Sequence, residues 1–245
     1  MNWPAGYGRR VLAEVDSTNA EAARVAPALA GPEWILGLRQ TSGRGRRGRV
    51  WAMPEGNFAA TLVMRPHEPP AVVALRSFVA SLALRDAVAQ VAGPGGLALK
   101  WPNDVLLNGG KLAGILLESL GGPGGHLAIG IGVNLAGVPD LSQLEPGAVA
   151  PVSIRGETGA EVTPEVFLDC LAAAYARREE QFVTFGFAPV RAAWLASAAR
   201  IGEEITARMP RETVTGTFET VDEAGNLVLK TGRARVTIAA AEIFF

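Results

Sequence analysis

The chain has 245 residues, of which 49% are apolar and 19% charged, and its formal net charge is −1. This composition can bury a sizeable core, which excludes wholesale disorder. The near-neutral charge argues against a general nucleic-acid-binding protein, which would usually be basic.

The chain carries no sign of secretion or membrane insertion. No apolar run reaches the roughly 18 residues of a membrane-spanning helix, and the N-terminal MNWPAGYGRR lacks the apolar core of a signal peptide. The single cysteine, Cys170, cannot form an internal disulfide and is expected to be buried and inert. We therefore expect a cytoplasmic protein. A structural metal site is not expected either, because the sequence contains no CxxC or HExxH and its two histidines fall in Pro- or Gly-rich loops.

The first part of the chain predicts two helices and two strands. A helix over 17–29 can be capped by Ser17 or Thr18, with Glu21 at capping-box spacing. Strands are expected over 34–39 and 57–64. A long helix over 71–91 should place Arg76, Arg85 and Asp86 on its polar side.

The rest of the first 200 residues continues the alternation of strands and helices. Strands are expected over 97–107, 111–119 and 127–134, with Gly109-Gly110 as a tight hairpin turn. Helices are expected over 164–183, with Thr163 as N-cap, and over 187–199.

The sequence pattern changes after Arg200, where short runs of alternating apolar and polar residues are separated by turns at Asp222–Gly225 and Thr231-Gly232. These runs predict a small all-β, barrel-like unit. The expected organisation is therefore a mixed α and β body over 1–200 and a small β domain over 201–245.

Two glycine-containing stretches could bind an anion. GRGRRGR (43–49) combines glycines, which let the backbone approach a ligand, with arginine forks that match carboxylate and phosphate oxygens. The same run could also be a solvated loop or a nucleic-acid-binding segment. In GGKLAGILLE (109–118), Lys111 opens a strand beside small residues and could reach a bound anion, or it could be an ordinary solvated lysine.

Three further stretches carry polar groups at bends and strand ends. In KWPND (100–104), Asp104 could hold Mg²⁺ that travels with ATP, or Asn103 and Asp104 could simply form a turn. In GIGVN (130–134), the glycines indicate close approach of a ligand or a bulge. DSTN (16–19) could bind a neutral polar head group or only cap a helix.

In this order and spacing, the five stretches resemble the biotin–protein ligases over about residues 10–200, with KWPND followed by GKLAGIL as the most specific part. The resemblance implies an α+β fold, with a mixed-sheet catalytic domain of the biotin/lipoate ligase type and a small C-terminal SH3-like β-barrel domain. It implies an ATP-dependent ligase that forms biotinyl-5′-AMP and transfers biotin to a lysine of a biotin carboxyl carrier domain. The cofactors would be ATP and Mg²⁺, with biotin as the substrate.

The resemblance also implies roles for individual residues. Lys111 and Arg46 would be catalytic, and Asp104 would be a metal ligand. The residues expected at biotin are Ser17, Thr18, Asn19, Gln40, Gly43, Arg44, Gly45, Arg46, Lys111 and Gly114. Those expected at ATP are Arg44, Arg46, Arg47, Arg49, Trp51, Asn103, Asp104, Lys111 and Asn134.

Some expectations concern partners and alternatives. Some family members carry an N-terminal DNA-binding domain, but only fifteen residues precede DSTN, so we expect no operator DNA among the partners; a homodimer is allowed. The tail AAAEIFF lacks a basic residue, which argues against a role of the C-terminal domain in ATP binding. The nearest alternative is a lipoate–protein ligase or octanoyl transferase of the same fold. A nucleic-acid-binding module is disfavoured, because Trp51 is the sole aromatic near the arginines before Phe58.

Overall fold

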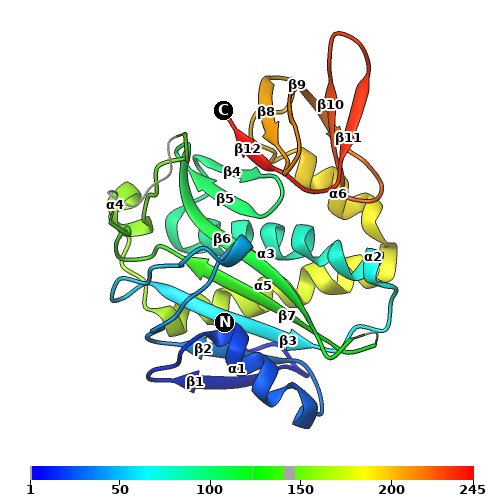
Figure 1. Ribbon diagram of the computed structural model, residues 1–245. Coiled ribbons are helices and arrows are strands. Elements are labelled where there is room, and N and C mark those ends of the chain that lie inside the picture. The colour runs from blue at the N-terminus through cyan, green and yellow to red at the C-terminus, as the bar shows by residue number, and fades with distance from the viewer. Residues whose placement is uncertain (1, 123, 141–146) are drawn as a thin grey trace.

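The computed structural model of the chain describes residues 2–122, 124–140 and 147–245. Its larger part is built on a seven-stranded mixed sheet in the order β1-β2-β3-β7-β6-β5-β4 (Figure 1). The first two neighbours pair in parallel and the other neighbours pair antiparallel. The strands are β1 (Gly8–Leu12), β2 (Glu33–Gly37), β3 (Phe58–Met64), β4 (Leu97–Lys100), β5 (Asp104–Leu107), β6 (Gly110–Leu120) and β7 (His126–Val133).

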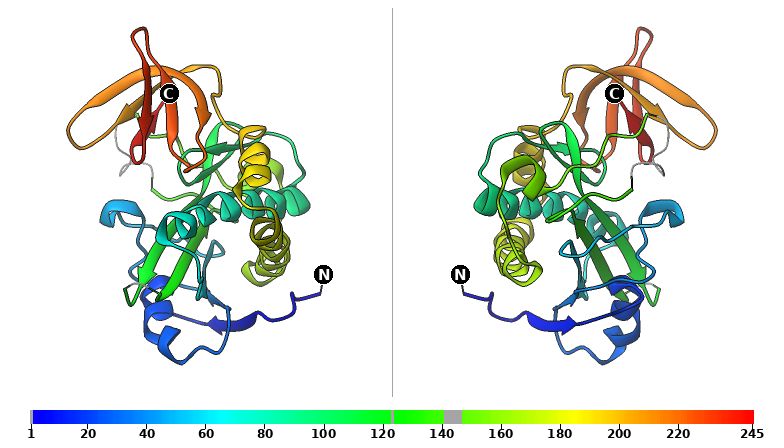
Figure 2. Two further views of the ribbon diagram at one scale, coloured as in Figure 1. Left: turned by 90° about the vertical axis from the view of Figure 1, so that its right-hand side faces the viewer. Right: turned by 90° about the vertical axis from the view of Figure 1, so that its left-hand side faces the viewer.

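Helices cover the two faces of this sheet unequally. The long helices α3 (Arg76–Ala92) and α5 (Pro164–Phe185) pack together against one face (Figure 2). The short helix α1 (Thr18–Val25) lies on the opposite face, where Ala22 packs with Ile35 and Val63. One face of the sheet is therefore buried by two long helices, and much of the other face is left for the site. Because successive strand residues point to opposite faces, the same strands contribute side chains to both the core and the site.

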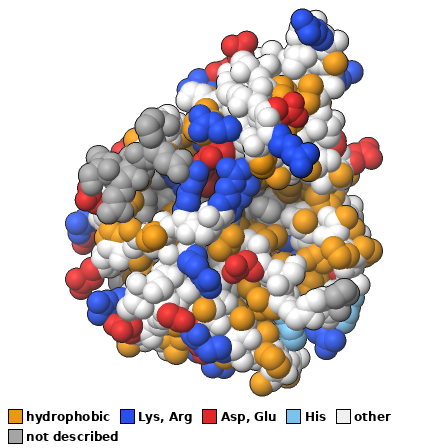
Figure 3. Space-filling view, in the orientation of Figure 1, with side chains coloured by type: hydrophobic (Ala, Val, Ile, Leu, Met, Phe, Trp, Pro, Cys, Tyr) orange, Lys and Arg blue, Asp and Glu red, His pale blue; other side chains and the backbone are white. Residues whose placement is uncertain are grey.

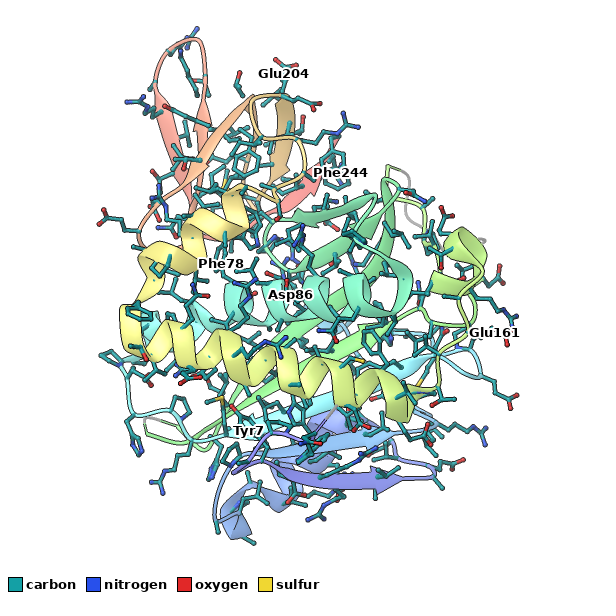
Figure 4. The ribbon with its side chains drawn as sticks, turned by 180° about the vertical axis from the view of Figure 1, so that it is seen from behind. Tyr7, Phe78, Asp86, Glu161, Glu204 and Phe244 are labelled. Carbon is teal, nitrogen blue, oxygen red and sulfur yellow. The ribbon has the colours of Figure 1, made fainter. Side chains whose placement is uncertain are left out.

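The C-terminal residues form a separate five-stranded antiparallel sheet in the order β11-β10-β9-β8-β12. It is held to the larger sheet through α3 and α6, where the ring of Trp194 lies 5.3 Å from Phe78 and 6.5 Å from Phe218. Figure 4 shows Phe78 where α3 approaches α6 and this sheet. The strands are β8 (Glu204–Arg208), β9 (Thr213–Val221), β10 (Leu227–Lys230), β11 (Arg235–Ile238) and β12 (Glu242–Phe244), and α6 spans Phe187–Leu195.

Several predicted boundaries are corrected by the structure. The helix predicted over 71–91 is broken at Leu75 into α2 (Pro70–Ala74) and α3. The strand predicted over 97–107 is two antiparallel strands, β4 and β5, with Pro102 between them, because a proline cannot donate to a sheet ladder. The hairpin turn lies at Asn108-Gly109 rather than Gly109-Gly110. Both residues have positive φ, at 50° and 82°, which suits a two-residue type I′ turn.

The prediction that Arg76 lies on a polar helix face was wrong. Its side chain is 2% exposed and forms ion pairs with Glu179 at 2.7 Å and Glu68 at 2.8 Å. The guanidinium also lies 5.2 Å from the centre of the Phe182 ring. Helical spacing around Arg76 gives no hint of this burial, because its partners come from a loop and from α5.

The helix ends differ from the predictions in detail. Ser17 occupies the N-cap position of α1 but its side chain makes no capping hydrogen bond, and a short 3₁₀ turn follows over Ala26–Ala28. Thr163 caps α5 as predicted, accepting a hydrogen bond from Val166. Strands β1 and β12 were not predicted. β1 is short and exposed along part of its length, and β12 has only three residues, so no clear alternation marks either.

Candidate active site

A cavity of about 520 Å³ lies on the α1 face of the large sheet, between the arginine-rich loop and strand β12 of the C-terminal sheet. It brings together polar ends of strands, the start of α1 and the loop that the sequence singled out. Gly43 and Arg47 are not among its lining residues. The predicted site residues that line it are Ser17, Thr18, Asn19, Gln40, Arg44, Gly45, Arg46, Arg49, Trp51, Asn103, Asp104, Lys111, Gly114 and Asn134.

One end of the cavity is polar and neutral. The backbone N–H of Thr18 donates to Gln40 Oε1 at 2.8 Å, and the Asn19 amide nitrogen donates to Glu118 Oε2 at 2.6 Å. The hydroxyl of Thr61 lies 2.8 Å from Thr18 Oγ1 and 2.6 Å from Asn19 Oδ1. The contacts join α1, β3, β6 and the loop after β2, so the start of α1 is held at a fixed place above the sheet.

Thr61 and Glu118 were not predicted as part of this end of the site. Thr61 is fully buried and does not line the cavity itself. The available signal was one polar side chain inside the apolar run FAATLVM, since a buried polar group needs a hydrogen-bond partner. The identity of that partner could not be read from the sequence.

The other end of the cavity is charged. Lys111 Nζ lies 2.9 Å from Asp104 Oδ1, and their side chains are 34% and 15% exposed. The half-buried Arg46 donates to Asn103 Oδ1 at 3.1 Å, while the Asn103 amide donates to the Ile115 carbonyl at 2.7 Å. Burial lowers the pKa of the Arg46 guanidinium from its ordinary value. This end therefore presents cations that have lost part of their water, which strengthens their pull on an anion.

Lys100 also lines the charged end, although the sequence analysis assigned it no role. Burial lowers the pKa of its ammonium from the ordinary value. Its Nζ lies 4.9 Å from the centre of the Phe245 ring. The C-terminal sheet thus covers one flank of the charged end.

The arginine-rich loop closes on itself and is tied to the C-terminal sheet. The Trp51 N–H donates to the Gly43 carbonyl at 2.9 Å. Both terminal nitrogens of Arg49 contact the Glu242 carboxylate, at 2.5 and 3.0 Å, and Arg47 contacts it at 3.2 Å. The hydrogen bond from Arg49 lowers the pKa of Glu242. Figure 3 shows basic side chains gathered around acidic ones in the middle of this face.

The C-terminal sheet therefore reaches the cavity. Glu242, Ile243 and Phe244 of β12 line the wall. The sheet makes this contact through one acidic residue and two apolar ones, and the expectation that it has no role in ATP binding stays a prediction. Figure 4 shows Phe244 at the end of the C-terminal sheet that faces the large sheet.

Glycines in two neighbouring strands make room for side chains of this chain, whereas GIGVN was expected to mark a ligand or a bulge. Gly114 and Gly132 are direct partners across β6 and β7. A Cβ atom on Gly132 would lie 2.4 Å from Trp51 Cε2, and one on Gly114 would lie 3.3 Å from Trp51 Cζ3. A Cβ on Gly130 would lie 2.2 Å from Asn19 Oδ1. Side chains from the loop and from α1 thus rest directly on the sheet backbone.

Replacing Gly130 by alanine is expected to destabilise the chain by about 1–3 kcal/mol, because the new methyl group would push Asn19 from its hydrogen bonds with Thr61 and Glu118. Urea unfolding of the wild type and variant measures the loss. Gly95→Ala is the matched control, since nothing lies within 4 Å of a Cβ there. A Gly130→Ala variant as stable as the control would contradict this account of the strand.

Asn134, predicted near a nucleotide, lines the cavity and also has a structural task. Its amide nitrogen donates to the Val152 carbonyl at 3.0 Å, and Asn57 donates to its Oδ1 at 3.5 Å. It thereby holds the start of the 150–159 segment against the end of β7.

The carboxylates do not form a ready metal cage. Within the described ranges there is no group of three or more His, Cys, Asp or Glu side chains placed to hold an ion. Asp104 already faces the ammonium of Lys111, so a bound cation there would meet a like charge. Mg²⁺ does not fit this side-chain set as a resident ion.

Comparison with known proteins gives a consistent result. The biotin/lipoate A/B protein ligase family matches residues 11–134, and the biotin protein ligase C-terminal domain matches residues 201–245. A biotin–[acetyl-CoA-carboxylase] ligase of Paracoccus denitrificans is 58% identical over 96% of this chain and 99% of its own. The bifunctional ligase/repressor BirA of Bacillus subtilis is 31% identical over 85% of this chain and 65% of its own.

Among solved structures, a biotin protein ligase from Aquifex aeolicus in complex with biotin and ATP superposes with a TM-score of 0.84. The two sequences are 24% identical, over 96% of this chain and 97% of that one. The similarity confirms the predicted α+β fold.

No helix among the described residues is long and apolar enough to span a membrane.

Proposed function

The chain belongs to the biotin/lipoate A/B protein ligase family, and from that premise we propose that it is a biotin–protein ligase. It joins biotin to ATP, forming biotinyl-5′-AMP and pyrophosphate, and then transfers biotin to a lysine of a biotin carboxyl carrier domain. We propose two domains, 1–200 for binding and chemistry and 201–245 as a smaller β domain. The 58% identity over nearly the whole of both chains favours this activity over lipoate or octanoate transfer.

One observation carries the proposal: a single cavity has a neutral polar end and a cationic end. A cyclic urea needs paired donors and acceptors, which Thr18, Asn19 and Gln40 can supply. A carboxylate and a phosphate need cations, which Arg46 and Lys111 can supply. Biotin carries the urea and the carboxylate at opposite ends of one molecule, so it matches both ends of the cavity at once.

In the first step, a biotin carboxylate oxygen attacks the α-phosphorus of ATP. The new P–O bond forms as the bond to the departing pyrophosphate breaks, and the pyrophosphate leaves with the electron pair. Both reactants are anionic, so their repulsion opposes the approach. Lys111 and Arg46 lie at the same end of the cavity and neutralise that charge, which is electrostatic stabilisation by preorganised groups.

In the second step, the amine of the carrier lysine attacks the acyl carbon of the mixed anhydride. The C–O bond to AMP breaks, an amide bond forms, and the amine loses a proton. AMP leaves as an anion, so the cations that served the first step also stabilise this leaving group. Mg²⁺ is proposed to enter with the nucleotide phosphates, and no step is assigned to it.

The carrier and the compartment are part of the proposal. The partner is a biotin carboxyl carrier protein or domain, as expected from the enzyme's second step. We place the reaction in the cytoplasm, a proposal supported by a lone, buried cysteine, since burial raises the pKa of the Cys170 thiol and keeps it unreactive.

Thermal unfolding separates the proposed substrate from its nearest alternative. A ligand at about 100 times its Kd stabilises the folded state by about 2.7 kcal/mol, which raises Tm by several degrees. Biotin should raise Tm in this way, whereas lipoate and octanoate at the same concentration should leave it unchanged. A shift with lipoate alone would move the function to the sister ligases.

We expect residues 43–53 to become protected from trypsin when biotin and Mg-ATP are both present. Anionic ligands in the cavity compete with Glu242 for Arg49, which lines it, and a loop that wraps the adenylate also excludes water from it. Cleavage after the loop arginines should slow by at least about tenfold, read by mass spectrometry.

Glu242→Gln provides the control for the loop prediction. Without ligand it should be cut faster than the wild type, because the loop has lost its carboxylate partner; with ligand the two should be equally protected. Equal cleavage of the wild-type loop with and without ligands would count against the closing role.

A further inference from the structure

The polar end of the cavity contains an unbroken series of hydrogen bonds that begins at a carboxylate and ends at Thr18, which lines the cavity. Glu118 Oε2 lies 2.6 Å from Asn19 Nδ2, Asn19 Oδ1 lies 2.6 Å from Thr61 Oγ1, and Thr61 Oγ1 lies 2.8 Å from Thr18 Oγ1. Thr18 and Asn19 line the cavity, whereas Thr61 and Glu118 do not. All three uncharged members are at least 94% buried, so water is largely excluded from these contacts.

The chemistry of each group fixes the direction of the next hydrogen bond. A carboxylate only accepts, so the Asn19 amide must present its nitrogen to Glu118 and its oxygen to Thr61. An amide oxygen only accepts, so the single hydroxyl hydrogen of Thr61 must go to Asn19. Thr61 then has only lone pairs left for Thr18. The hydroxyl hydrogen of Thr18 goes to Thr61 at 2.8 Å rather than to Gln40 Oε1 at 3.2 Å, because the shorter of two oxygen–oxygen contacts is the more repulsive when no hydrogen lies between them.

The last group of the series is the Thr18 hydroxyl, and the direction of its hydrogen bond to Thr61 fixes what it can offer to the cavity. Once its hydrogen points to Thr61, Thr18 Oγ1 offers only lone pairs to the cavity. The 3.2 Å separation from Gln40 Oε1 is then a contact between two acceptors, and it is the longest in the group. Gln40 Oε1 instead accepts from the Thr18 N–H at 2.8 Å, which leaves its Nε2 as a donor.

We propose that Glu118 and Thr61 are positioning residues that hold the Thr18 hydroxyl as an acceptor toward the ligand, and that this polarity selects a cyclic urea. The inference rests on the proposed function and extends it. A urea N–H would donate to Thr18, and the urea carbonyl would accept from Gln40 Nε2. A ligand with an acceptor in place of that N–H would face a second acceptor and be rejected.

Two cyclic-carbamate analogues of biotin test the polarity directly. In each analogue one of the two ring N–H groups is replaced by oxygen, which changes a donor into an acceptor at almost constant shape. Isothermal calorimetry on the full chain gives the Kd of biotin and of each analogue. For one isomer, the wild type should prefer biotin by about 100-fold or more.

The variant Thr61→Val keeps the side-chain shape but removes the hydroxyl, so the Thr18 hydrogen is no longer held by Thr61 and can turn to Gln40 Oε1 or donate to a ligand. Biotin binding should weaken about tenfold, because the acceptor is no longer fixed. For the carbamate isomer that the wild type rejects by about 100-fold, the preference for biotin should fall to about tenfold or less. Preference over the other isomer should not change, which gives a reference within each protein.

Three further variants separate polarity from general damage. Glu118→Gln can accept from or donate to Asn19, so both directions become available and the preference should fall in the same sense. Thr61→Ser restores the hydroxyl and should restore the preference. Thr215→Val removes a hydroxyl from a similar pair in the C-terminal sheet, 2.9 Å from Thr206, and should change nothing.

The outcomes divide clearly. A reduced preference in folded Thr61→Val or Glu118→Gln, restored in Thr61→Ser, supports the proposal; if the valine variant does not fold, Glu118→Gln decides. An unchanged preference in the folded variants overturns it while leaving the proposed function intact. Failure of the wild-type chain to bind biotin would instead overturn the proposed function.

Discussion

Replacing Lys111 by methionine is expected to slow biotin-dependent pyrophosphate release by about 10²–10³-fold, the usual effect of removing one preorganised charge from a reacting oxyanion. Lys111 stands beside the small residues of β6, at the cationic end of the cavity, with Asp104 at 2.9 Å. Methionine keeps the length of the side chain and removes the charge. The fold should survive, because the lysine side chain is 34% exposed and methionine preserves the apolar contacts of its stem.

Pre-steady-state release of pyrophosphate measures the loss in the first step alone. Circular dichroism and Tm show whether the variant is folded, and Lys230→Met on an exposed strand position serves as the matched control. The variant should still bind biotin at the neutral end with an affinity within about tenfold of the wild type, since the urea contacts are untouched. Near-normal pyrophosphate release by a folded Lys111→Met chain would remove Lys111 from the chemistry.

Replacing Arg46 by methionine should have the second largest effect, a loss of about 10²-fold in adenylate formation with added leakage of the intermediate. Arg46 is half-buried and is oriented by Asn103, which is itself fixed to β6. Because it belongs to the loop, it can both neutralise the phosphate and help to close the cavity. Loss of the guanidinium therefore affects the reaction and the protection of its product.

The two roles of Arg46 have different readouts. The ratio of pyrophosphate released to biotin attached to the carrier reports how much adenylate is lost to water. It should stay near one in the wild type and rise several-fold in Arg46→Met. Arg46→Lys should recover part of the rate but little of the retention, because an ammonium lacks the planar fork that binds two oxygens. If Arg46→Met is slow but its ratio of pyrophosphate to attached biotin is unchanged, Arg46 stabilises charge and has no part in retaining the adenylate.

The sequence was informative where a local pattern carries the chemistry. DSTN, the arginine–glycine loop, KWPND, GGKLAGILLE and GIGVN lie far apart in the chain, yet the sheet order brings them to one cavity. The glycines of GIGVN illustrate why this was readable: a strand glycine reports close approach of some group, even when that group is unknown. The structure identifies the groups as Trp51 and Asn19.

The remaining features depend on partners that no local pattern identifies. Arg76 looks like a surface residue until Glu179, on a helix a hundred residues later, is placed against it. Glu118 is an acidic residue inside the largely apolar strand β6, and its role becomes visible only through its contact with Asn19. Glu242 is one acidic residue in an apolar tail, and its contact with Arg47 and Arg49 arises because β12 lies beside the loop. Such pairings are set by tertiary packing.

The arrangement also suggests why one cavity can serve two successive reactions. Under the proposed function, the neutral end holds the part of biotin that does not react, so the carboxyl group stays in place while its partner changes from phosphate to amine. The cationic end meets an anion in both steps. The loop and the C-terminal sheet flank that end, linked by Glu242, and are placed to respond when the nucleotide arrives or leaves.

The most direct test of the central claim is pyrophosphate release from Mg-ATP with biotin, lipoate and octanoate as parallel substrates. Release with biotin alone is the predicted result, and it would establish the acid, the nucleotide and the adenylating step together. Release with lipoate or octanoate in place of biotin, or no release with any acid from a folded chain, would contradict it.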